Sequence, residues 1–297
     1  MDRALPADLP SQRPSGPAVL ELLKPVTWFP PMWAYGCGLV SAGQPLSDHW
    51  FDALLGVCLA GPLVCGTSQA VNDWFDRHVD AINQPERPIP SGRIPGRWGL
   101  YIALFWTFCS LMVAASLGRI VFVAAALGLA MAWAYSAPPF RFKRNGWYGN
   151  SAVGLCYEGL PWVTGAAVLL GGGMRPSILL LALCYSIGAH GIMTLNDFKA
   201  VRGDRASGVG SLPVRLGEAQ AARLACLTMG GAQIAVIGLL VTRGAHVHAA
   251  IVATSLALQV LAMRRLLSDP ARFAPWYNMT GVSLFVSGMM VSAHAVR

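Results

Sequence analysis

The residues best suited to chemistry in this sequence are five aspartates in two short runs. Asp73, Asp76 and Asp80 form the first run, and Asp197 and Asp204 form the second. An α-helix turns by about 100° per residue, so the first three fall at about 0°, 300° and 340° and share one helical face. Asp197 and Asp204 are seven positions apart, and they too share a face if their helix continues.

The two runs read as an internal repeat. Both follow the pattern Asn-Asp-x-x-[Asp/Ala]-x-x-x-Asp, beginning at Asn72 and at Asn196. A segment rich in Gly, Pro and Ser follows each run, over residues 88–93 and 208–213. The second copy has Ala200 where the first has an acid. The repeat predicts two acidic faces that point together.

Acidic faces of this kind need a cation. Each run stands at the C-terminal end of an expected helix, where the helix dipole disfavours negative charge, and carboxylates on one face repel each other. Mg²⁺ takes a few carboxylates together with water and phosphate oxygens, and Arg and Lys side chains neutralise a phosphate group. The pattern therefore predicts a Mg²⁺–diphosphate site. The alternative interpretation is that these are solvated residues near helix ends. A single run would leave that alternative open, whereas two matching runs on one side of the membrane argue against it.

The elements that must hold these residues are apolar helices. Hydrophobic residues make up 55% of the 297-residue chain, charged residues 12%, and the mean hydropathy is +0.50. Soluble domains carry about 25% charged residues, so this composition excludes an ordinary soluble enzyme, a disordered tail and a nucleic-acid module. A bilayer core needs about 20 apolar residues per helix. We therefore expect an all-α polytopic membrane protein with nine transmembrane helices, at 26–43, 52–71, 98–117, 120–136, 150–170, 177–196, 219–241, 246–263 and 276–295.

Nine spans leave no room for a separate soluble domain. Residues 26–297 are therefore expected to form a single transmembrane domain. Residues 1–25 contain several prolines and acids and lack the apolar core of a signal peptide, which predicts a flexible cytoplasmic arm.

The basic residues predict the orientation. Of the 22 Lys and Arg residues, only Arg119, Arg175, Arg243 and Arg297 fall on the side opposite the N-terminus. Because short cytoplasmic loops carry an excess of Lys and Arg, the N-terminus and both acidic runs are expected in the cytoplasm and the C-terminus in the periplasm. The net charge of +8 is then a consequence of topology, and no nucleic-acid partner is expected.

The motifs resemble those of the UbiA superfamily of intramembrane prenyltransferases over essentially the whole chain. The resemblance is carried by NDWFDRHVDAIN (72–83), RPIPSGR (87–93), YSAPP (135–139) and GLPWVTG (159–165), and it is closest to the branch that makes chlorophyll and bacteriochlorophyll. It implies a nine-helix UbiA-like fold in the inner or intracytoplasmic membrane of a photosynthetic bacterium. The implied reaction is Mg²⁺-dependent esterification of the propionate of (bacterio)chlorophyllide by geranylgeranyl or phytyl diphosphate, with release of diphosphate.

Carried over residue by residue, the resemblance implies two sets of site residues. The Asp residues of both runs are the implied metal-binding and catalytic residues. The implied diphosphate-binding or substrate-binding residues are amide and basic side chains in and near the runs: Asn72, Arg87, Arg93, Arg141, Lys143, Asn196, Lys199 and Arg202. Several relatives have an acid at the position of Ala200, so the second run departs from the family pattern.

Two further ionisable residues lie inside expected spans. Glu158 falls near the middle of 150–170, where an acid costs about 2.5–3.5 kcal/mol on insertion scales. His190 lies two helical turns deeper than Asp197 on the same face. Both are candidate pigment contacts, and His190 could ligate the central magnesium of a chlorophyllide. Alternatively, Glu158 is a neutral hydrogen-bonded carboxyl and His190 is a hydrogen-bonded core residue.

Two other functions fit part of the pattern. Another UbiA-type prenyltransferase, from a quinone or haem pathway, would use the same acidic runs. A cation-coupled transporter would also place acids in helices, but transporter sites lie near the membrane midplane, whereas these acids gather at one interface. Mg²⁺-dependent release of diphosphate from an allylic donor would distinguish an enzyme from a transporter.

Overall fold

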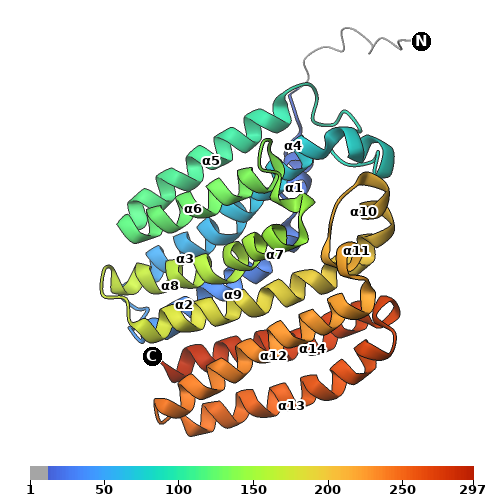
Figure 1. Cartoon of the computed structure of the whole chain (residues 1–297). Coiled ribbons are helices and arrows are strands. Elements are labelled where there is room, and N and C mark those ends of the chain that lie inside the picture. The colour runs from blue at the N-terminus through green and yellow to red at the C-terminus, as the bar shows by residue number, and fades with distance from the viewer. Residues whose placement is uncertain (1–12) are drawn as a thin grey trace, which may run out of the picture.

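The computed structural model describes residues 13–297, which are nearly all helical (Figure 1). The α-helices in this range are α1 (Gly16–Leu23), α2 (Phe29–Ala42), α3 (Trp50–Cys58), α4 (Gly66–Asn83), α5 (Trp98–Leu117), α6 (Arg119–Ser136), α7 (Gly146–Gly154), α8 (Leu160–Leu170), α9 (Pro176–Asp197), α10 (Val201–Ser207), α11 (Leu212–Leu216), α12 (Glu218–Thr242), α13 (His246–Ser268) and α14 (Pro270–Ala295). No β-strand occurs between residues 13 and 297, so the expected all-α fold is confirmed.

Three long helices are built from shorter ones joined by irregular turns. A π-helical segment, Leu59–Cys65, joins α3 to α4, and a second, Leu155–Gly159, joins α7 to α8. A 3₁₀ turn, Phe198–Ala200, joins α9 to α10. Pro62 lies inside the first π segment and Pro161 lies two residues after the second, where the missing proline N–H would break a regular ladder. Such π segments within α-helices are rare and frequently lie at functional sites.

The long helices pack side by side in layers. In Figure 1, α5 and α6 lie on one side of the bundle and α12, α13 and α14 on the other, with α2, α4, α8 and α9 between them. Helices α2 and α8 approach each other closely at two glycines. A Cβ added at Gly38 would lie 2.1 Å from the Trp162 carbonyl oxygen, and a Cβ added at Gly165 would lie 2.1 Å from the Tyr35 carbonyl oxygen. Small residues allow this kind of contact between membrane helices.

The expected count of nine spans is not confirmed. Seven helices in the described part of the chain are long and apolar enough to cross a membrane: 50–83, 98–117, 119–136, 146–170, 176–207, 218–242 and 246–268. The expected span 26–43 corresponds to α2, whose 14 residues cover only about 21 Å. The expected span 276–295 lies in α14, which carries many Ser, Thr and Asn side chains. Neither helix is among the seven.

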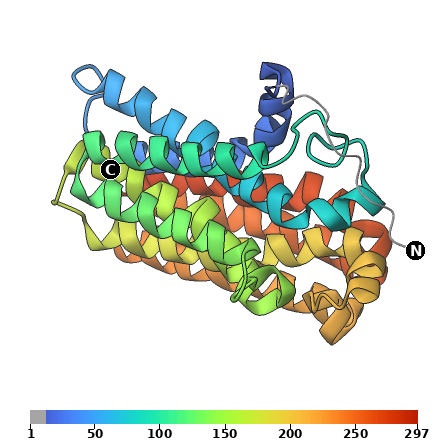
Figure 2. The same cartoon turned by 90° about the horizontal axis from the view of Figure 1, so that it is seen from above.

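Part of the arm expected over residues 1–25 is helical. Residues 1–12 lie outside the described residues, but Gly16–Leu23 form a helix with the Ser15 side chain as its N-cap. Leu22 and Leu23 of α1 are buried against Ala70 and Val71 of α4, so an apolar contact holds the helix on the bundle. Figure 2 shows that α1 runs across the direction of the long helices.

Candidate active site

A cavity of about 410 Å³ opens among α2, α4, α6 and the composite helices that contain α7 and α9. Asn72 of the first acidic run and Asn196 of the second both line it, whereas no aspartate of either run does. Tyr135 at the end of α6 also lines the cavity, and Asn72 donates a 3.2 Å hydrogen bond to the neighbouring Ser136 hydroxyl. Both π-helical segments contribute residues to the wall.

The cavity changes from polar to apolar with distance from the acidic runs. Along the composite helix of α3 and α4, the lining residues are first Asn72, Gln69 and Ser68, and then Val64 and Leu59. From residue 72 to residue 59 a helix rises by about 20 Å. On the facing side, α6 lines the cavity mostly with alanine and glycine. The shape is suited to a ligand with a charged head and a long apolar tail.

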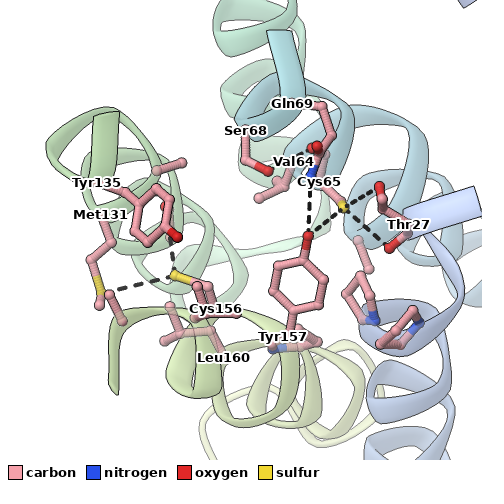
Figure 3. A pocket seen from close by; sticks show the side chains of 18 of the residues that line it. Thr27, Val64, Cys65, Ser68, Gln69, Met131, Tyr135, Cys156, Tyr157 and Leu160 are labelled. Carbon is pink, nitrogen blue, oxygen red and sulfur yellow. Dashed lines mark hydrogen bonds between the residues drawn. The ribbon is translucent and has the colours of Figure 1, made fainter. Parts of the chain in front are cut away.

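A small polar cluster interrupts the apolar wall. Figure 3 shows the Tyr157 side chain pointing toward Gln69 and Cys65. The Gln69 amide donates a 3.2 Å hydrogen bond to the Tyr157 hydroxyl, and the Cys65 thiol lies 3.5 Å from the same oxygen. Thr27 contacts Cys65 from the other side, which joins three separate parts of the chain.

Each carboxylate of the first run is paired with a basic side chain. Asp73 is only 1% exposed, and its Oδ1 accepts hydrogen bonds from Lys24 at 2.6 Å and Arg87 at 3.3 Å. Arg87 also donates to Oδ2 of Asp80 at 2.7 Å, which confirms that Asp73 and Asp80 share a face.

Asp76 is paired with a residue from a different loop. Lys143, which follows α6, donates a hydrogen bond to Oδ1 of Asp76. Burial lowers the pKa of the Lys143 ammonium group, while the adjacent Asp76 charge opposes that change. The first run is therefore surrounded by cations drawn from three separate segments of the chain.

The second run is held by amide side chains. Asn150 of α7 donates to Oδ2 of Asp197 at 3.1 Å, and Asn278 of α14 donates to Oδ1 of Asn196 at 2.9 Å. Asp204 lies in α10, beyond the 3₁₀ turn. Because a 3₁₀-helix turns by about 120° per residue, three such residues rotate Asp204 by about 60° from its position on a continuous α-helix.

Two loops meet at this end of the bundle. The Gly146 N–H donates to the Gly210 carbonyl at 2.8 Å, and the Gly210 N–H donates to the Arg144 carbonyl at 2.9 Å. This bridge holds the segment that carries Arg141 and Lys143 against the segment that follows the second run. Figure 1 places α10 and α11 at the end of the bundle opposite the C-terminus.

Backbone strain is concentrated at the same end. Lys24 and Arg141 are the two non-glycine residues between 13 and 297 with a positive φ, at 48° and 42°. A left-handed conformation costs roughly 1–2 kcal/mol for a residue with a Cβ. Both residues are basic, and the Arg141 Nε is buried without a hydrogen-bond partner. Strained residues of this kind cluster at functional sites.

The remaining predicted site residues lie farther from these contacts. Arg93 donates to the exposed Glu21 of α1 and to the Glu86 carbonyl, rather than to an acid of either run. Lys199 and Arg202 are exposed, and neither forms an ion pair with an acid of the described chain.

Neither candidate pigment contact lines the cavity. Glu158 and His190 are both buried, and the Glu158 Oε2 and His190 Nδ1 atoms have no hydrogen-bond partner in the described structure. The imidazole ring of His190 lies beside the Trp147 ring, with 5.8 Å between the ring centroids.

Sequence reasoning missed Lys24 and Asn150 as site residues. Lys24 falls within the expected N-terminal arm. The only feature of the local sequence that sets it apart is the following proline, which marks the boundary before the next helix. Asn150 offers no signal in the sequence, because its contact with Asp197 joins residues 47 positions apart.

The residues of the first run fit a hard divalent cation. They offer carboxylate oxygens only, which are the ligands Mg²⁺ prefers, and the buried Oδ2 of Asp73 has no hydrogen-bond partner. Among the described residues, no three Asp, Glu, His or Cys side chains surround one point. A cation here would therefore need oxygens from water or from a phosphate to complete its coordination, as Mg²⁺ commonly does.

Comparison with solved structures supports the fold. The chain superimposes on a structure of digeranylgeranylglyceryl phosphate synthase with a TM-score of 0.75 and 21% identity, covering 94% of this chain and 98% of the other. A UbiA homologue from Archaeoglobus fulgidus bound to DMAPP and Mg²⁺ gives a TM-score of 0.73 at 20% identity, over 92% of this chain and 98% of that one.

Relatives known by their sequences share a higher identity with this chain than these solved structures do. The bacteriochlorophyll synthase 33 kDa chain of Cereibacter sphaeroides is 60% identical over 97% of this chain and 95% of its own length. The chloroplastic chlorophyll synthase of Oryza sativa is 37% identical over 93% of this chain and 76% of its own length. Residues 27–288 match the model of the UbiA prenyltransferase family. This chain therefore belongs to the UbiA prenyltransferase family, as the acidic runs and the helical fold indicate.

Proposed function

We propose that this membrane prenyltransferase esterifies the propionate of bacteriochlorophyllide with geranylgeranyl or phytyl diphosphate and releases diphosphate. The observation that carries the proposal is the 60% identity, over nearly the full length, to a bacteriochlorophyll synthase chain. The lower identity to the plant chlorophyll synthase, 37%, favours bacteriochlorophyllide over chlorophyllide as the acceptor. The cavity, with an asparagine of each acidic run at its polar end and apolar residues along its length, supports a prenyl diphosphate as the donor.

In this proposal the acidic runs bind the head of the donor. Asp73, Asp76 and Asp80, with Asp197 and Asp204, would hold Mg²⁺, which supplies Lewis-acid stabilisation of the leaving diphosphate when bound. Lys24, Arg87 and Lys143 already lie beside these carboxylates, and we assign them to neutralise the diphosphate as its bond to carbon breaks. Arg141 joins them, since its buried Nε has no partner within the described chain.

The rest of the cavity would hold and protect the tail. Its apolar wall excludes water, which would otherwise capture the cationic prenyl carbon. The attacking propionate needs no general base, because a carboxylate is ionised at neutral pH. Asn150 orients Asp197, and Asn278 orients Asn196, so both amides act as positioning residues for the second run.

Several further assignments complete the proposal. Residues 26–297 act as a single transmembrane domain, with the acidic end and the N-terminus in the cytoplasm and the C-terminus in the periplasm, in the membrane of a photosynthetic bacterium. Glu158 and His190 are kept as proposed pigment contacts, although neither lines the donor cavity.

An acceptor panel tests the function. Membranes containing the chain are incubated with labelled geranylgeranyl diphosphate, Mg²⁺ and, in parallel, bacteriochlorophyllide, chlorophyllide or an aromatic quinone precursor. We expect the labelled ester to form fastest with bacteriochlorophyllide and to disappear when the metal is chelated. Labelling of the aromatic acceptor instead would assign the chain to another branch of the family.

A further inference from the structure

A second apolar groove lies on the surface, outside the active-site cavity. It has a volume of about 600 Å³ and runs between α1 and α5. Its walls are Val19, Leu20 and Leu23 on α1 and Trp98, Tyr101 and Phe105 on α5. No residue lines both this groove and the active-site cavity. Leu20, Tyr101 and Phe105 remain more than half exposed, so residues 13–297 leave the groove largely uncovered.

The groove follows from the way two helices pack on a third. Helices α1 and α5 both contact α4, and the buried Leu23 and Ile102 form the floor between them. Because α1 runs across the direction of α5, the two cannot close against each other along their length (Figure 2). Beyond the groove, α5 continues with exposed Phe108 and Met112, which is the surface expected of a helix facing lipid tails. A ligand can therefore enter the groove from the bilayer.

Two exposed arginines adjoin lining residues of the groove in the sequence. Arg97 immediately precedes Trp98 and is exposed, and it pairs with no acid in the described residues. Arg13, also exposed, immediately precedes Pro14, which lines the groove. The one acid of α1, Glu21, is already bound to Arg93. Trp98 and Tyr101 form an edge-to-face pair with their ring centroids 6.0 Å apart, and such aromatic side chains favour the level of lipid headgroups.

We propose that this groove is a binding site for an anionic phospholipid. The phosphate headgroup lies at Arg97 and Arg13, and one acyl chain lies along the aromatic face of α5. Basic residues next to a membrane surface attract anionic lipids, and the apolar groove adds the selectivity of a shaped site.

The site is connected to the catalytic end through α1. Leu23 of the groove wall is followed directly by Lys24, which pairs with Asp73. A lipid that fills the groove holds α1 on the bundle and so keeps Lys24 at the acidic run. The inference stands apart from the identity of the pigment acceptor, because it concerns only the packing of α1.

Lipid binding by the purified full-length chain is the test. After delipidation, phosphatidylglycerol, phosphatidylcholine or soluble glycerol phosphate is added, and bound lipid is counted by native mass spectrometry while thermal unfolding is followed. We expect phosphatidylglycerol to bind and to raise the melting temperature more than phosphatidylcholine does. Glycerol phosphate alone should give no shift, because it cannot use the apolar groove.

Matched variants locate the site. Arg97→Gln should weaken phosphatidylglycerol binding about fivefold, which corresponds to about 1 kcal/mol for one basic residue at an anionic surface. Phe105→Ala should weaken binding of both lipids, whereas Arg243→Gln, at the opposite end of the bundle, should bind as the wild type does. Equal binding of the two lipids, or wild-type binding by Arg97→Gln, would overturn the proposal. Stronger lipid binding after removal of residues 1–12 would instead assign the groove to that segment.

Discussion

Lys24 donates a 2.6 Å hydrogen bond to Oδ1 of Asp73, although 49 residues separate them in the sequence. Lys24 ends α1 in a left-handed conformation, and Asp73 is almost completely buried in α4. The contact makes α1 part of the candidate active site, because it delivers a positive charge to the first acidic run from outside the apolar bundle.

Replacing Lys24 should weaken donor binding. In Lys24→Gln, one charge-assisted hydrogen bond is lost, worth about 1.5–3 kcal/mol, so kcat/KM for the prenyl diphosphate should fall about 10- to 100-fold. Lys24→Arg should recover most of the loss. Steady-state kinetics with varied geranylgeranyl diphosphate measure the effect, and Arg243→Gln, at the opposite end of the bundle, is the control. Wild-type kinetics for Lys24→Gln would remove Lys24 from the site.

Loss of an acid from the first run should abolish prenyl transfer. Asp73→Ala or Asp76→Ala removes a proposed metal ligand and strands a neighbouring cation, so we expect kcat to fall by about 10²-fold or more. Circular dichroism and size-exclusion chromatography should show that the variants remain folded. The control is Asp269→Asn, which keeps the exposed N-cap of α14, because Asn caps a helix as well as Asp does. Most of the activity surviving at saturating Mg²⁺ would contradict the assignment.

The asymmetry between the two runs should appear in metal binding. The first run offers three carboxylates and the second offers two. In the second run, Ala200 lies in the 3₁₀ turn between Asp197 and Asp204. We expect Mg²⁺ to bind more tightly at the first run and to occupy the second mainly together with diphosphate. Ala200→Asp should strengthen metal binding without substrate, yet it need not raise kcat, because tighter ground-state binding does not lower the barrier. In isothermal titration, two equally tight sites that Ala200→Asp leaves unaltered would refute the asymmetry.

The Arg93–Glu21 pair should hold α1 rather than the donor. The hydrogen bond from Arg93 lowers the pKa of the Glu21 carboxyl below its usual value. A carboxyl whose pKa is lowered on folding stabilises the folded state above its unfolded pKa, near 4.5, and loses this effect as the pH falls through its folded pKa.

Variants of this pair give the measurement. At pH 7, Glu21→Gln and Arg93→Gln should each lower the melting temperature only slightly, because the pair is exposed. The difference in melting temperature between the wild type and Glu21→Gln should shrink as the pH falls through the pKa that Glu21 has in the folded protein. If Arg93→Gln raises KM for the prenyl diphosphate while Glu21→Gln does not, Arg93 binds the donor instead.

The close approach of α2 and α8 should tolerate no added methyl group. In Gly38→Ala the new Cβ would meet the Trp162 carbonyl oxygen at 2.1 Å, so we expect a loss of about 1–3 kcal/mol or more. Gly36→Ala is the matched control on the same helix, since no atom lies within 4 Å of its added Cβ. The melting temperature should fall for Gly38→Ala alone. Equal melting temperatures for the two variants would show that the helices can separate at no cost.

Long apolar runs made most of the helices predictable. The expected spans 98–117 and 120–136 agree with α5 and α6 almost to the residue, because each is a continuous apolar run between charged or glycine-rich turns. The spans 26–43 and 276–295 meet the same criterion, but α2 is short and α14 carries several Ser, Thr and Asn side chains. Periodicity also could not show the 3₁₀ turn after Asp197, which rotates Asp204 relative to its partner.

The arrangement of the acidic side chains could be predicted from the sequence, but the basic side chains that pair with them could be predicted less well. The spacing of Asp73 and Asp80 placed both on one face, and Arg87 bridges them in the structure. Which cation meets which acid depends on tertiary packing: Lys24 reaches Asp73 across 49 residues, and Lys143 reaches Asp76 across 67. Contacts of this range have no local signature, so Arg93 was expected at the diphosphate and lies instead on Glu21.

The fate of the propionate oxygens tests the central claim most directly. Bacteriochlorophyllide carrying ¹⁸O in both propionate oxygens is incubated with the purified chain, Mg²⁺ and geranylgeranyl diphosphate, and the ester and the diphosphate are analysed by mass spectrometry. If the carboxylate attacks the prenyl carbon, the ester retains both labelled oxygens and the diphosphate carries none. An ester that has lost one labelled oxygen, or the absence of any ester, would contradict the account.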